Sequence, residues 1–293
     1  MPDSFHKLCL ICNGSNINTL SGYERHDLLK CENCGFVFMR KIPTGTELEN
    51  YYSIYAYEKE KKIPEPTRLS FENLLDSFEK YRQNNRILDV GCGEGWILEL
   101  AMNRGWETYG TEFSSKAIEI CENKGIKMYA GVLKPENIKE RDFDVIVSSE
   151  TIEHINNPRE ELANIHQLLR TGGLFYITTP NFNSYLRRMM KDKYAIIKYP
   201  EHLSYYTATT LNKLLSETGF TKVKLMTTGI SLSHYQLSKI NDDERDFTNK
   251  KADEELRNKI AKSSALQVLK KQINSGLTFL SIGMTLKGFY TKK

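Results

Sequence analysis

The most informative stretch of the sequence is a glycine-rich turn between two predicted elements. A short apolar run at 86–90, which includes Asp89, leads into glycines at alternate positions, Gly91, Gly93 and Gly95, and a helical pattern follows. Glycine has no Cβ, so a ligand can lie against the backbone there, and the residue can adopt a positive φ. The helix would turn its unpaired N–H groups and positive dipole end toward that ligand. We predict a binding turn for an adenosine-containing cofactor; the alternative is a strand–helix connection without a ligand.

Four of the six cysteines form two close pairs near the start of the sequence. They are Cys9 and Cys12, then Cys31 and Cys34, with residues 13–30 between the pairs. This spacing fits a zinc site in which four thiolates complete a closed tetrahedral shell. We expect a structural zinc ion, Zn(2+), with no position left for a catalytic water. Redox-active or unmetallated thiols are the alternatives. Metal binding would supply much of the folding free energy of so small a module.

Alternating strand and helix patterns place the glycine turn within a larger sheet. Strands are expected at 86–90, 107–112, 126–130, 144–148, 174–179, 220–228 and 285–290, and helices at 67–82, 95–104, 114–124, 158–170 and 207–219. This order predicts an α/β fold with a doubly wound, mainly parallel, seven-stranded Rossmann-like sheet. Ligands of such sheets bind at the carboxyl ends of the strands.

The chain is expected to fall into three segments. These are a zinc-ribbon-like four-cysteine module over 1–42, a tyrosine-rich linker and helix over 43–84, and the α/β domain over 85–293 with a charged helical insertion at about 231–275. The start of the linker, residues 41–66, is predicted to be irregular. Its cluster of tyrosines packs against the main domain or, alternatively, covers the ligand as a lid: Tyr51, Tyr52, Tyr55 and Tyr57.

Composition sets limits on the class of protein. With 40% hydrophobic and 27% charged residues over 293 positions, the chain has the composition of a globular protein. Its net charge of +4 is not gathered into a Lys/Arg run, so charge gives no argument for nucleic acid. No signal-peptide core is evident, and the apolar tract 277–286 is too short to span a bilayer. We expect a cytoplasmic protein without a nucleic-acid partner or membrane span, its oligomeric state open between monomer and dimer.

Glu112 closes the second predicted strand, about 20 residues beyond the glycine turn. A carboxylate there can accept hydrogen bonds from both ribose hydroxyls of an adenosine group. NAD would satisfy the same arrangement, so this residue by itself leaves the cofactor open.

Further segments carry a resemblance to a known family. The segment 86–95 resembles motif I of the class I S-adenosylmethionine (SAM) methyltransferases, and 142–158 resembles motif IV of their ubiquinone- and small-molecule-type members, with its E-H-x-x-x-P ending. The segment 168–174 resembles the helix–turn–strand "LkpGG" element, and 200–207 another recurring segment of that group. The resemblance covers about 85–228. It implies SAM rather than NAD as the cofactor.

The resemblance also implies which residues contact the cofactor. They are Asp89, Gly91, Cys92, Gly93, Gly95, Glu112, Phe113, Val132, Leu133, Ser149 and Glu150. The family often carries an acidic residue after the third strand, where it meets the adenine amino group. This chain has Gly131-Val132-Leu133 there instead, so we expect apolar contact with the adenine and no carboxylate hydrogen bond.

Methyl transfer from a sulfonium depends on aligning donor and acceptor, and an oxygen or carbon acceptor also loses a proton to a base. His202 and His154 are the candidate bases, since imidazole titrates near neutral pH; structural histidines are the alternative. Zinc knuckles before such a core resemble enzymes of bacterial sugar and polysaccharide pathways. A hydroxyl of a sugar, nucleotide sugar or glycan is the expected acceptor, with carbon less favoured. An RNA methyltransferase with the zinc module as a clamp, or a non-catalytic SAM-binding scaffold, are the rival interpretations.

Overall fold

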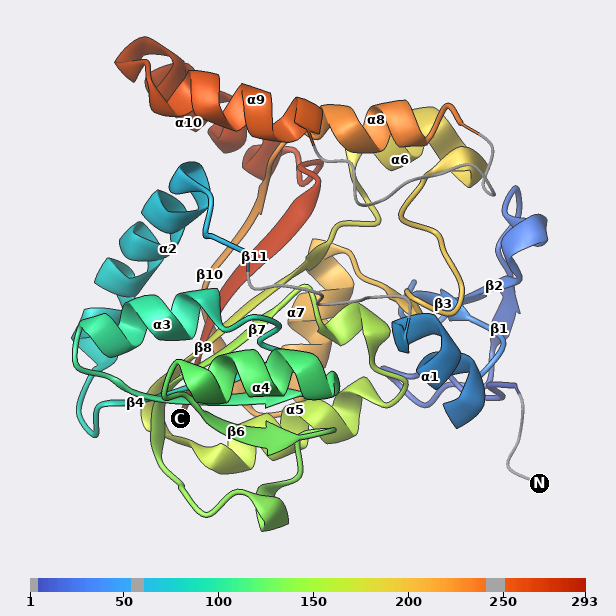
Figure 1. The fold of residues 1–293 in the computed structure, drawn as a ribbon. Helices are drawn as coiled ribbons and strands as arrows, with labels where there is room; N and C mark the ends of the chain where they lie inside the picture. Colours follow the sequence, from blue (N-terminus) through green and yellow to red (C-terminus); the bar gives the residue numbers. More distant parts are fainter. Residues whose placement is uncertain (1–4, 54–60, 241–250) are drawn as a thin grey trace. The chain divides into compact units, whose positions relative to one another are not determined.

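Two β-sheets organise the protein (Figure 1). The computed structural model describes residues 5–53, 61–240 and 251–293. A seven-stranded sheet has the order β10-β11-β8-β7-β4-β5-β6, and a four-stranded sheet has the order β1-β2-β3-β9. The predicted α/β fold with a mainly parallel seven-stranded sheet is thereby confirmed.

The chain divides into two compact units. The first comprises Met1–Thr44, Thr179–Leu211 and Leu225–Lys287, and the second Gly45–Thr178, Asn212–Lys224 and Gly288–Lys293. The three segments expected from the sequence follow a different division, and their boundaries stay a prediction.

The strands of the larger sheet lie close to their predicted positions. They are β4 (Arg86–Val90), β5 (Glu107–Glu112), β6 (Lys127–Ala130), β7 (Phe143–Ser149), β8 (Leu169–Pro180), β10 (Phe220–Thr228) and β11 (Thr285–Lys292). β4 pairs in parallel with β5 on one side and with β7 on the other. β8 begins five residues before its predicted start, because extended backbone continues through Gly172 and Gly173 while the register with β7 shifts near Phe143.

Helices α2 (Glu65–Phe78), α3 (Trp96–Asn103) and α4 (Ser115–Asn123) pack against this sheet in the second unit. Leu75 of α2 and Ile97 of α3 share a buried apolar cluster with Val145 of β7. α5 (Pro158–Leu168) and α7 (Ala208–Glu217) complete the predicted helices. Removing these side chains from water is the main contribution that holds the layers together.

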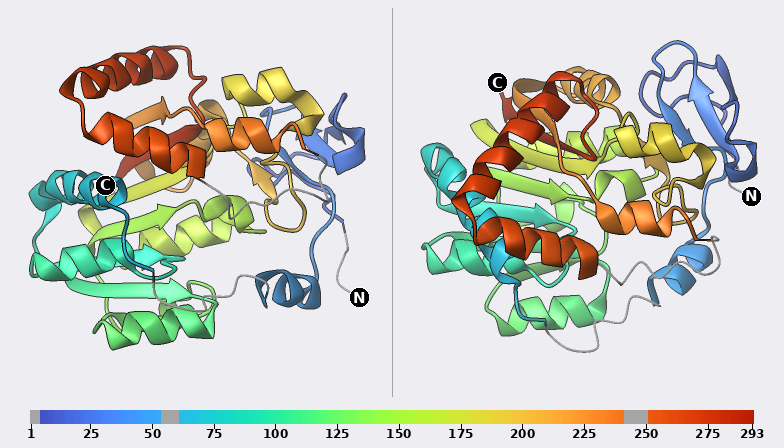
Figure 2. Two further views of the ribbon diagram at one scale, coloured as in Figure 1. Left: turned by 45° about the horizontal axis from the view of Figure 1, so that its top comes forward. Right: turned by 90° about the horizontal axis from the view of Figure 1, so that it is seen from above.

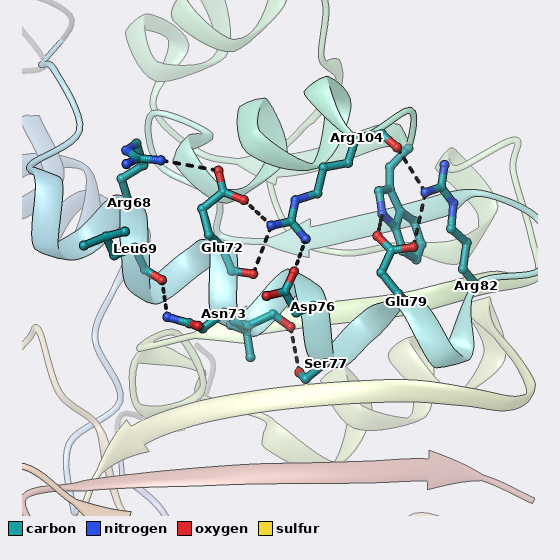
Figure 3. Close-up of polar contacts among 11 residues, drawn as sticks. Arg68, Leu69, Glu72, Asn73, Asp76, Ser77, Glu79, Arg82 and Arg104 are labelled. Atoms are coloured by element: carbon teal, nitrogen blue, oxygen red, sulfur yellow. Dashed lines mark hydrogen bonds and ion pairs between the residues drawn. The ribbon is translucent and has the colours of Figure 1, made fainter. Parts of the chain in front are cut away.

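Polar contacts tie α2 to the elements around the glycine turn (Figure 3). Arg104, which follows α3, forms ion pairs with Glu72 and with Asp76, the latter at 2.7 Å. Glu79 accepts a hydrogen bond of 3.1 Å from Trp106 Nε1 and pairs with a nearby arginine, Arg82. Ion pairs that are partly open to solvent each contribute little to the free energy of unfolding, so these pairs orient α2 more than they stabilise the fold.

The segment before α2 is more regular than predicted. Residues Gly45–Ser53 form helix α1, whereas 41–66 was expected to be irregular. Glu47 and Leu48 are good helix formers, and no proline interrupts the run before Pro64. Tyr51 lies in α1, and Tyr55 and Tyr57 lie outside the described residues.

The smaller sheet belongs to the first unit. β1 (Ile17–Thr19), β2 (Leu28–Cys31) and β3 (Val37–Met39) are antiparallel neighbours, and β9 (Ser204–Tyr205) pairs antiparallel with β3. Leu186 of α6 (Tyr185–Met190) belongs to the same buried apolar cluster as Leu28 of β2 and Val37 of β3. The expected insertion contains α8 (Leu232–Leu237), α9 (Lys251–Ala261) and α10 (Ser264–Phe279), and both views in Figure 2 show α9 beside α10. In the described parts of the chain, no helix is long and apolar enough to cross a membrane.

Candidate functional site

The glycine turn joins β4 to α3 in a conformation that suits glycine. Gly91, Gly93 and Gly95 have φ values of 72°, 53° and 70°. A Cβ on Gly91 would lie 2.9 Å from the Thr151 side chain, and one on Gly95 would lie 2.8 Å from Ile126 Cδ1. The positive φ disfavours residues with a Cβ at both positions, and a Cβ would also have to displace the Thr151 or the Ile126 side chain.

Glu112 anchors the turn from the end of the neighbouring strand β5. Its Oε2 accepts a hydrogen bond of 3.0 Å from Gly93 N, and its Oε1 accepts bonds of 2.8 Å and 3.1 Å from Phe113 N and Ser114 N. A carboxylate offers about four lone-pair sites. Three of these sites are used, so Glu112 holds the turn and still has acceptor capacity for a ribose hydroxyl.

Two buried carboxyl groups flank the same turn. Asp89 is 5% exposed and Glu94 is 7% exposed, and among the described residues neither Asp89 Oδ1 nor Glu94 Oε1 has a hydrogen-bond partner. Burial, and then the charge of Glu112, raises the pKa of Asp89 to about 8. A buried acceptor without a donor costs free energy, which a ligand that brings donors would recover.

The chemistry of these carboxyl groups separates the two cofactors left open by Glu112. SAM brings an ammonium group and a sulfonium, both positively charged, and so matches Asp89 and Glu94. The pyrophosphate of NAD is negatively charged and would face the same two groups with repulsion. The residues present therefore fit SAM. Glu94 was not predicted as a cofactor contact; its position between two glycines of the turn is the signal that could have found it.

An apolar patch lies beside Glu112. Phe113 and Val132 are both exposed, although they follow the ends of adjacent strands, β5 and β6. Gly131 N donates to Glu112 O at 2.8 Å, which holds the two strand ends together. A planar, apolar adenine fits such a patch. Leu133 is buried instead, and its carbonyl accepts a hydrogen bond from an asparagine, Asn164.

The end of β7 approaches the other side of the turn. Ser149 Oγ lies 3.0 Å from Thr178 Oγ1, and Glu150 has a φ of 53°, unusual for a residue with a side chain. Thr151 Oγ1 donates to Val90 O at 3.1 Å. Strained backbone of this kind often occurs at ligand sites. Thr151 was not predicted, because its contact with the turn arises only where two strand ends meet.

The two candidate bases belong to different units. In the second unit, His154 Nε2 lies 3.8 Å from Glu153 Oε1, and the Glu153 side chain is buried. In the first unit, His202 Nδ1 lies 2.6 Å from Ile196 O. A carbonyl oxygen only accepts, so Nδ1 of His202 donates its proton there and the lone pair of the neutral ring is on Nε2.

The four cysteines predicted as metal ligands come together in the first unit. Cys9 Sγ lies 3.5 Å from Cys34 Sγ, Cys12 Sγ lies 3.5 Å from Cys31 Sγ, and all four sulfurs lie within 4.8 Å of one another. Zinc–sulfur bonds of about 2.3 Å in a tetrahedron separate sulfurs by about 3.8 Å. Burial raises the pKa of the Cys9 thiol to about 11 and raises that of Cys34 as well. Four thiolates so close together need a cation, and their geometry fits zinc.

The cysteine module, defined here as β1–β3 with the four cysteines, takes its fourth strand from a distant part of the chain. β9 pairs with β3, and Met39 N donates to Leu203 O at 2.9 Å. The ring of Phe36 contacts that of Tyr206, with centroids 5.1 Å apart. The segment that follows His202 is thus a structural part of the cysteine module, which the sequence did not indicate.

Comparisons with known proteins identify the family of the chain. A family model described as a methyltransferase domain matches residues 61–225, more than half of the chain. A ubiquinone biosynthesis O-methyltransferase of Pelagibacter ubique is 32% identical over 129 residues, which cover 40% of this chain and 53% of that protein. The chain thus spans about half the length of this curated relative.

Solved structures show the same fold. A SAM-dependent methyltransferase from Archaeoglobus fulgidus gives a TM-score of 0.53 at 20% identity, covering 83% of this chain and 100% of that one. A putative sarcosine dimethylglycine methyltransferase from Galdieria sulphuraria gives 0.50 at 14% identity, covering 78% and 84%. The predicted resemblance to SAM-dependent methyltransferases is confirmed, and the chain belongs to the methyltransferase domain family.

Proposed function

We propose that the protein transfers a methyl group from SAM to a hydroxyl group of a small molecule, and that this acceptor is a sugar, nucleotide sugar or glycan. The observation that carries the SAM part is the pair of buried carboxyl groups Asp89 and Glu94, beside a turn already anchored by Glu112. One oxygen of each group, Asp89 Oδ1 and Glu94 Oε1, lacks a hydrogen-bond partner among the described residues. These three groups together match a cationic adenosine cofactor.

The residues of the second unit have distinct roles in this proposal. Glu112 accepts a ribose hydroxyl, while Asp89 and Glu94 accept the donors of the methionine end. Phe113 and Val132 cover the adenine, and Ser149 and Glu150 border the cofactor at the end of β7. The cofactor supplies an electrophilic methyl group on a sulfonium. The chain supplies alignment, which is the main requirement of an in-line displacement.

His202 is the better candidate for the base, because its hydrogen bond to Ile196 O fixes Nε2 as the nitrogen that accepts a proton. His154 is the second candidate, with Glu153 beside it. His202→Gln should lower kcat more than it raises KM if Nε2 takes the hydroxyl proton. Equal losses of stability and kcat would instead mark His202 as a structural residue.

Zinc in the cysteine module serves a structural role in this proposal. Its four thiolates would fill the coordination shell, so the ion has no open position for substrate. The pairing of β3 with β9 then connects the metal centre to the backbone after His202. The module would thereby keep the His202 segment ordered.

The proposal of a sugar acceptor rests on a resemblance: enzymes of sugar pathways also carry a zinc module before a methyltransferase core. A phenolic hydroxyl is a second candidate, since the relative from Pelagibacter ubique is named for ubiquinone biosynthesis and its match spans the core. An RNA acceptor and a non-catalytic SAM-binding protein are the remaining alternatives.

One experiment separates these acceptors. The protein is incubated with methyl-labelled SAM and, in separate reactions, nucleotide sugars, glycans, hydroxylated aromatic compounds and tRNA, with Glu112→Gln as the matched inactive variant. We expect label in a sugar-containing product, lost in the variant. Label only in the aromatic compounds or only in tRNA overturns the sugar acceptor. Tight SAM binding without transfer to any of them overturns catalysis, and preference for NAD over SAM overturns the cofactor.

A further inference from the structure

Helix α10 presents apolar side chains to solvent. Leu266, Leu269, Ile273 and Leu280 are all exposed, at positions three, four and seven residues apart along α10 and the residue that follows it. With 3.6 residues per turn, this spacing puts them on one face of the helix. Phe279 at the end of α10 is 89% exposed. Helices normally bury such a stripe, so a contiguous exposed stripe indicates an interaction surface.

The polar side of the helix holds it to the rest of its unit. Thr278 Oγ1 donates to Thr227 O at 2.9 Å, Thr227 Oγ1 donates to Leu277 O at 2.8 Å, and Asn274 Oδ1 accepts from Gly229 N at 2.9 Å. Asn274 and Thr278 are four residues apart and share a face that differs from the apolar stripe. These bonds fix α10 to the end of β10 while its apolar face stays outside.

The charged residues of α10 and of the segment before it are of one sign. From Leu256 to Lys271 every charged residue is basic, namely Arg257, Lys259, Lys262, Lys270 and Lys271. The acidic residues of α9 are confined to its first turns, and one of them, Asp253, accepts a hydrogen bond of 2.8 Å from Leu232 N. Apolar residues flanked by basic ones are typical of helices that lie on anionic membrane surfaces.

We propose that the hairpin of α9 and α10 binds the surface of an anionic lipid bilayer. Leu269, Ile273 and their neighbours in the stripe enter the interface, and Lys270, which lies about 70° around the helix from the centre of the stripe, contacts the acidic headgroups. Binding is peripheral, since the helix lies in the plane of the surface. A second copy of the chain is a poorer occupant, because a symmetric contact would place the same basic residues against each other. The proposal concerns a surface and does not depend on which hydroxyl is methylated.

Vesicle co-sedimentation of the whole chain tests this surface. The vesicles are pure phosphatidylcholine or phosphatidylcholine mixed with phosphatidylglycerol, at low and high salt. We expect binding to the mixed vesicles, weakened by salt, and little binding to the neutral ones. The double variant Leu269→Gln/Ile273→Gln should lower the partition coefficient at least about tenfold, since each buried apolar side chain adds to the binding.

Control variants distinguish binding through this surface from non-specific binding of the protein to vesicles. Val268→Gln changes an exposed apolar residue on another face of α10 and should leave vesicle binding unchanged. Lys270→Glu should weaken binding strongly, whereas Lys222→Glu, the same charge change on β10, should weaken it much less. Absent binding to anionic vesicles overturns the proposal, as does equal loss in both charge variants. Analytical sedimentation could instead show a dimer that the Leu269→Gln/Ile273→Gln variant does not form. Together with absent vesicle binding, that result would assign the stripe to contact with a second copy of the chain.

Discussion

The glycine turn and the cysteine module are two binding sites built in opposite ways. The turn is made by residues close in the chain, from Arg86 to Glu112, which form one strand–helix–strand unit. The cysteine module brings four thiols together from the first part of the chain, but its sheet is completed by β9, far along the sequence. The comparison teaches that a site within one supersecondary unit can be recognised from its spacing, whereas the surroundings of a site closed by a distant strand cannot.

The sites also differ in what a bound ligand would stabilise. The turn already has its backbone bonds from Glu112 and Thr111, and its glycines are packed against Thr151 and Ile126. We expect it to be formed before SAM binds. Four clustered thiolates repel one another unless a cation lies between them, so we expect the cysteine module to depend on its metal.

Metal removal should give the largest effect. Structural zinc contributes on the order of 10 kcal/mol of apparent binding free energy in small modules. A strong chelator, or Cys31→Ser, should therefore unfold β1–β3 and release β9, seen as lost amide-exchange protection there, while β4 and β5 stay protected. Metal analysis should find about one zinc ion per chain in the wild type.

Cys92→Ser is the matched control for this prediction, because Cys92 lies in the glycine turn and outside the cluster. It should retain the metal. A metal-free wild type with full protection in β1–β3 would show that the cysteine module folds through its apolar contacts alone.

The carboxyl groups at the turn should give the next largest effect. Asp89→Asn and Glu94→Gln each remove one charged acceptor, and a hydrogen bond to a charged group contributes about 1.5–3 kcal/mol. We expect SAM affinity, measured by calorimetry, to fall roughly ten- to a hundredfold in each variant. Glu122→Gln, an exposed acid on α4, should bind SAM as the wild type does. Unchanged affinity in both turn variants would show that the cofactor does not contact them.

A pair of glycine substitutions compares the two sites directly. Gly91→Ala meets both a φ of 72° and a Cβ contact of 2.9 Å with Thr151, whereas Gly22→Ala in the cysteine module meets a φ of 80° with nothing within 4 Å. Gly22→Ala should therefore cost about 1 kcal/mol of unfolding free energy, and Gly91→Ala about 1–3 kcal/mol more with loss of SAM binding. Urea unfolding measures both, and equal costs would mean that Thr151 moves aside.

The sequence predicted the glycine turn more completely than it predicted the surroundings of the cysteine module. β4 and β5 have their predicted bounds, and Glu112 lies beside Gly93 as its spacing implied. The pairing of β9 with β3 could not be predicted, since Ser204 and Tyr205 form too short a strand to leave a pattern. Thr151 was missed for a related reason. It follows β7, and it contacts the glycine turn only because the ends of β7 and β4 are neighbours in the folded sheet. Local sequence specifies the turn, whereas tertiary contacts specify what surrounds it.

The pH dependence of the glycine turn tests whether Asp89 binds a cation. Burial raises the pKa of Asp89 in the folded protein from its ordinary value of 3.8 to about 8. Between these values the folded state holds the extra proton, so stability without cofactor should fall as pH rises from about 4 to about 8 and then level off. A nearby ammonium group would lower the pKa of Asp89, so SAM binding at pH 7 should release up to about one proton. Calorimetry in buffers of different ionisation enthalpy measures that release. Asp89→Asn should abolish it and Asp142→Asn, an exposed aspartate, should keep it. Proton release of the same size in all three proteins would place the positive end of the cofactor away from Asp89, leaving Glu94 as its partner.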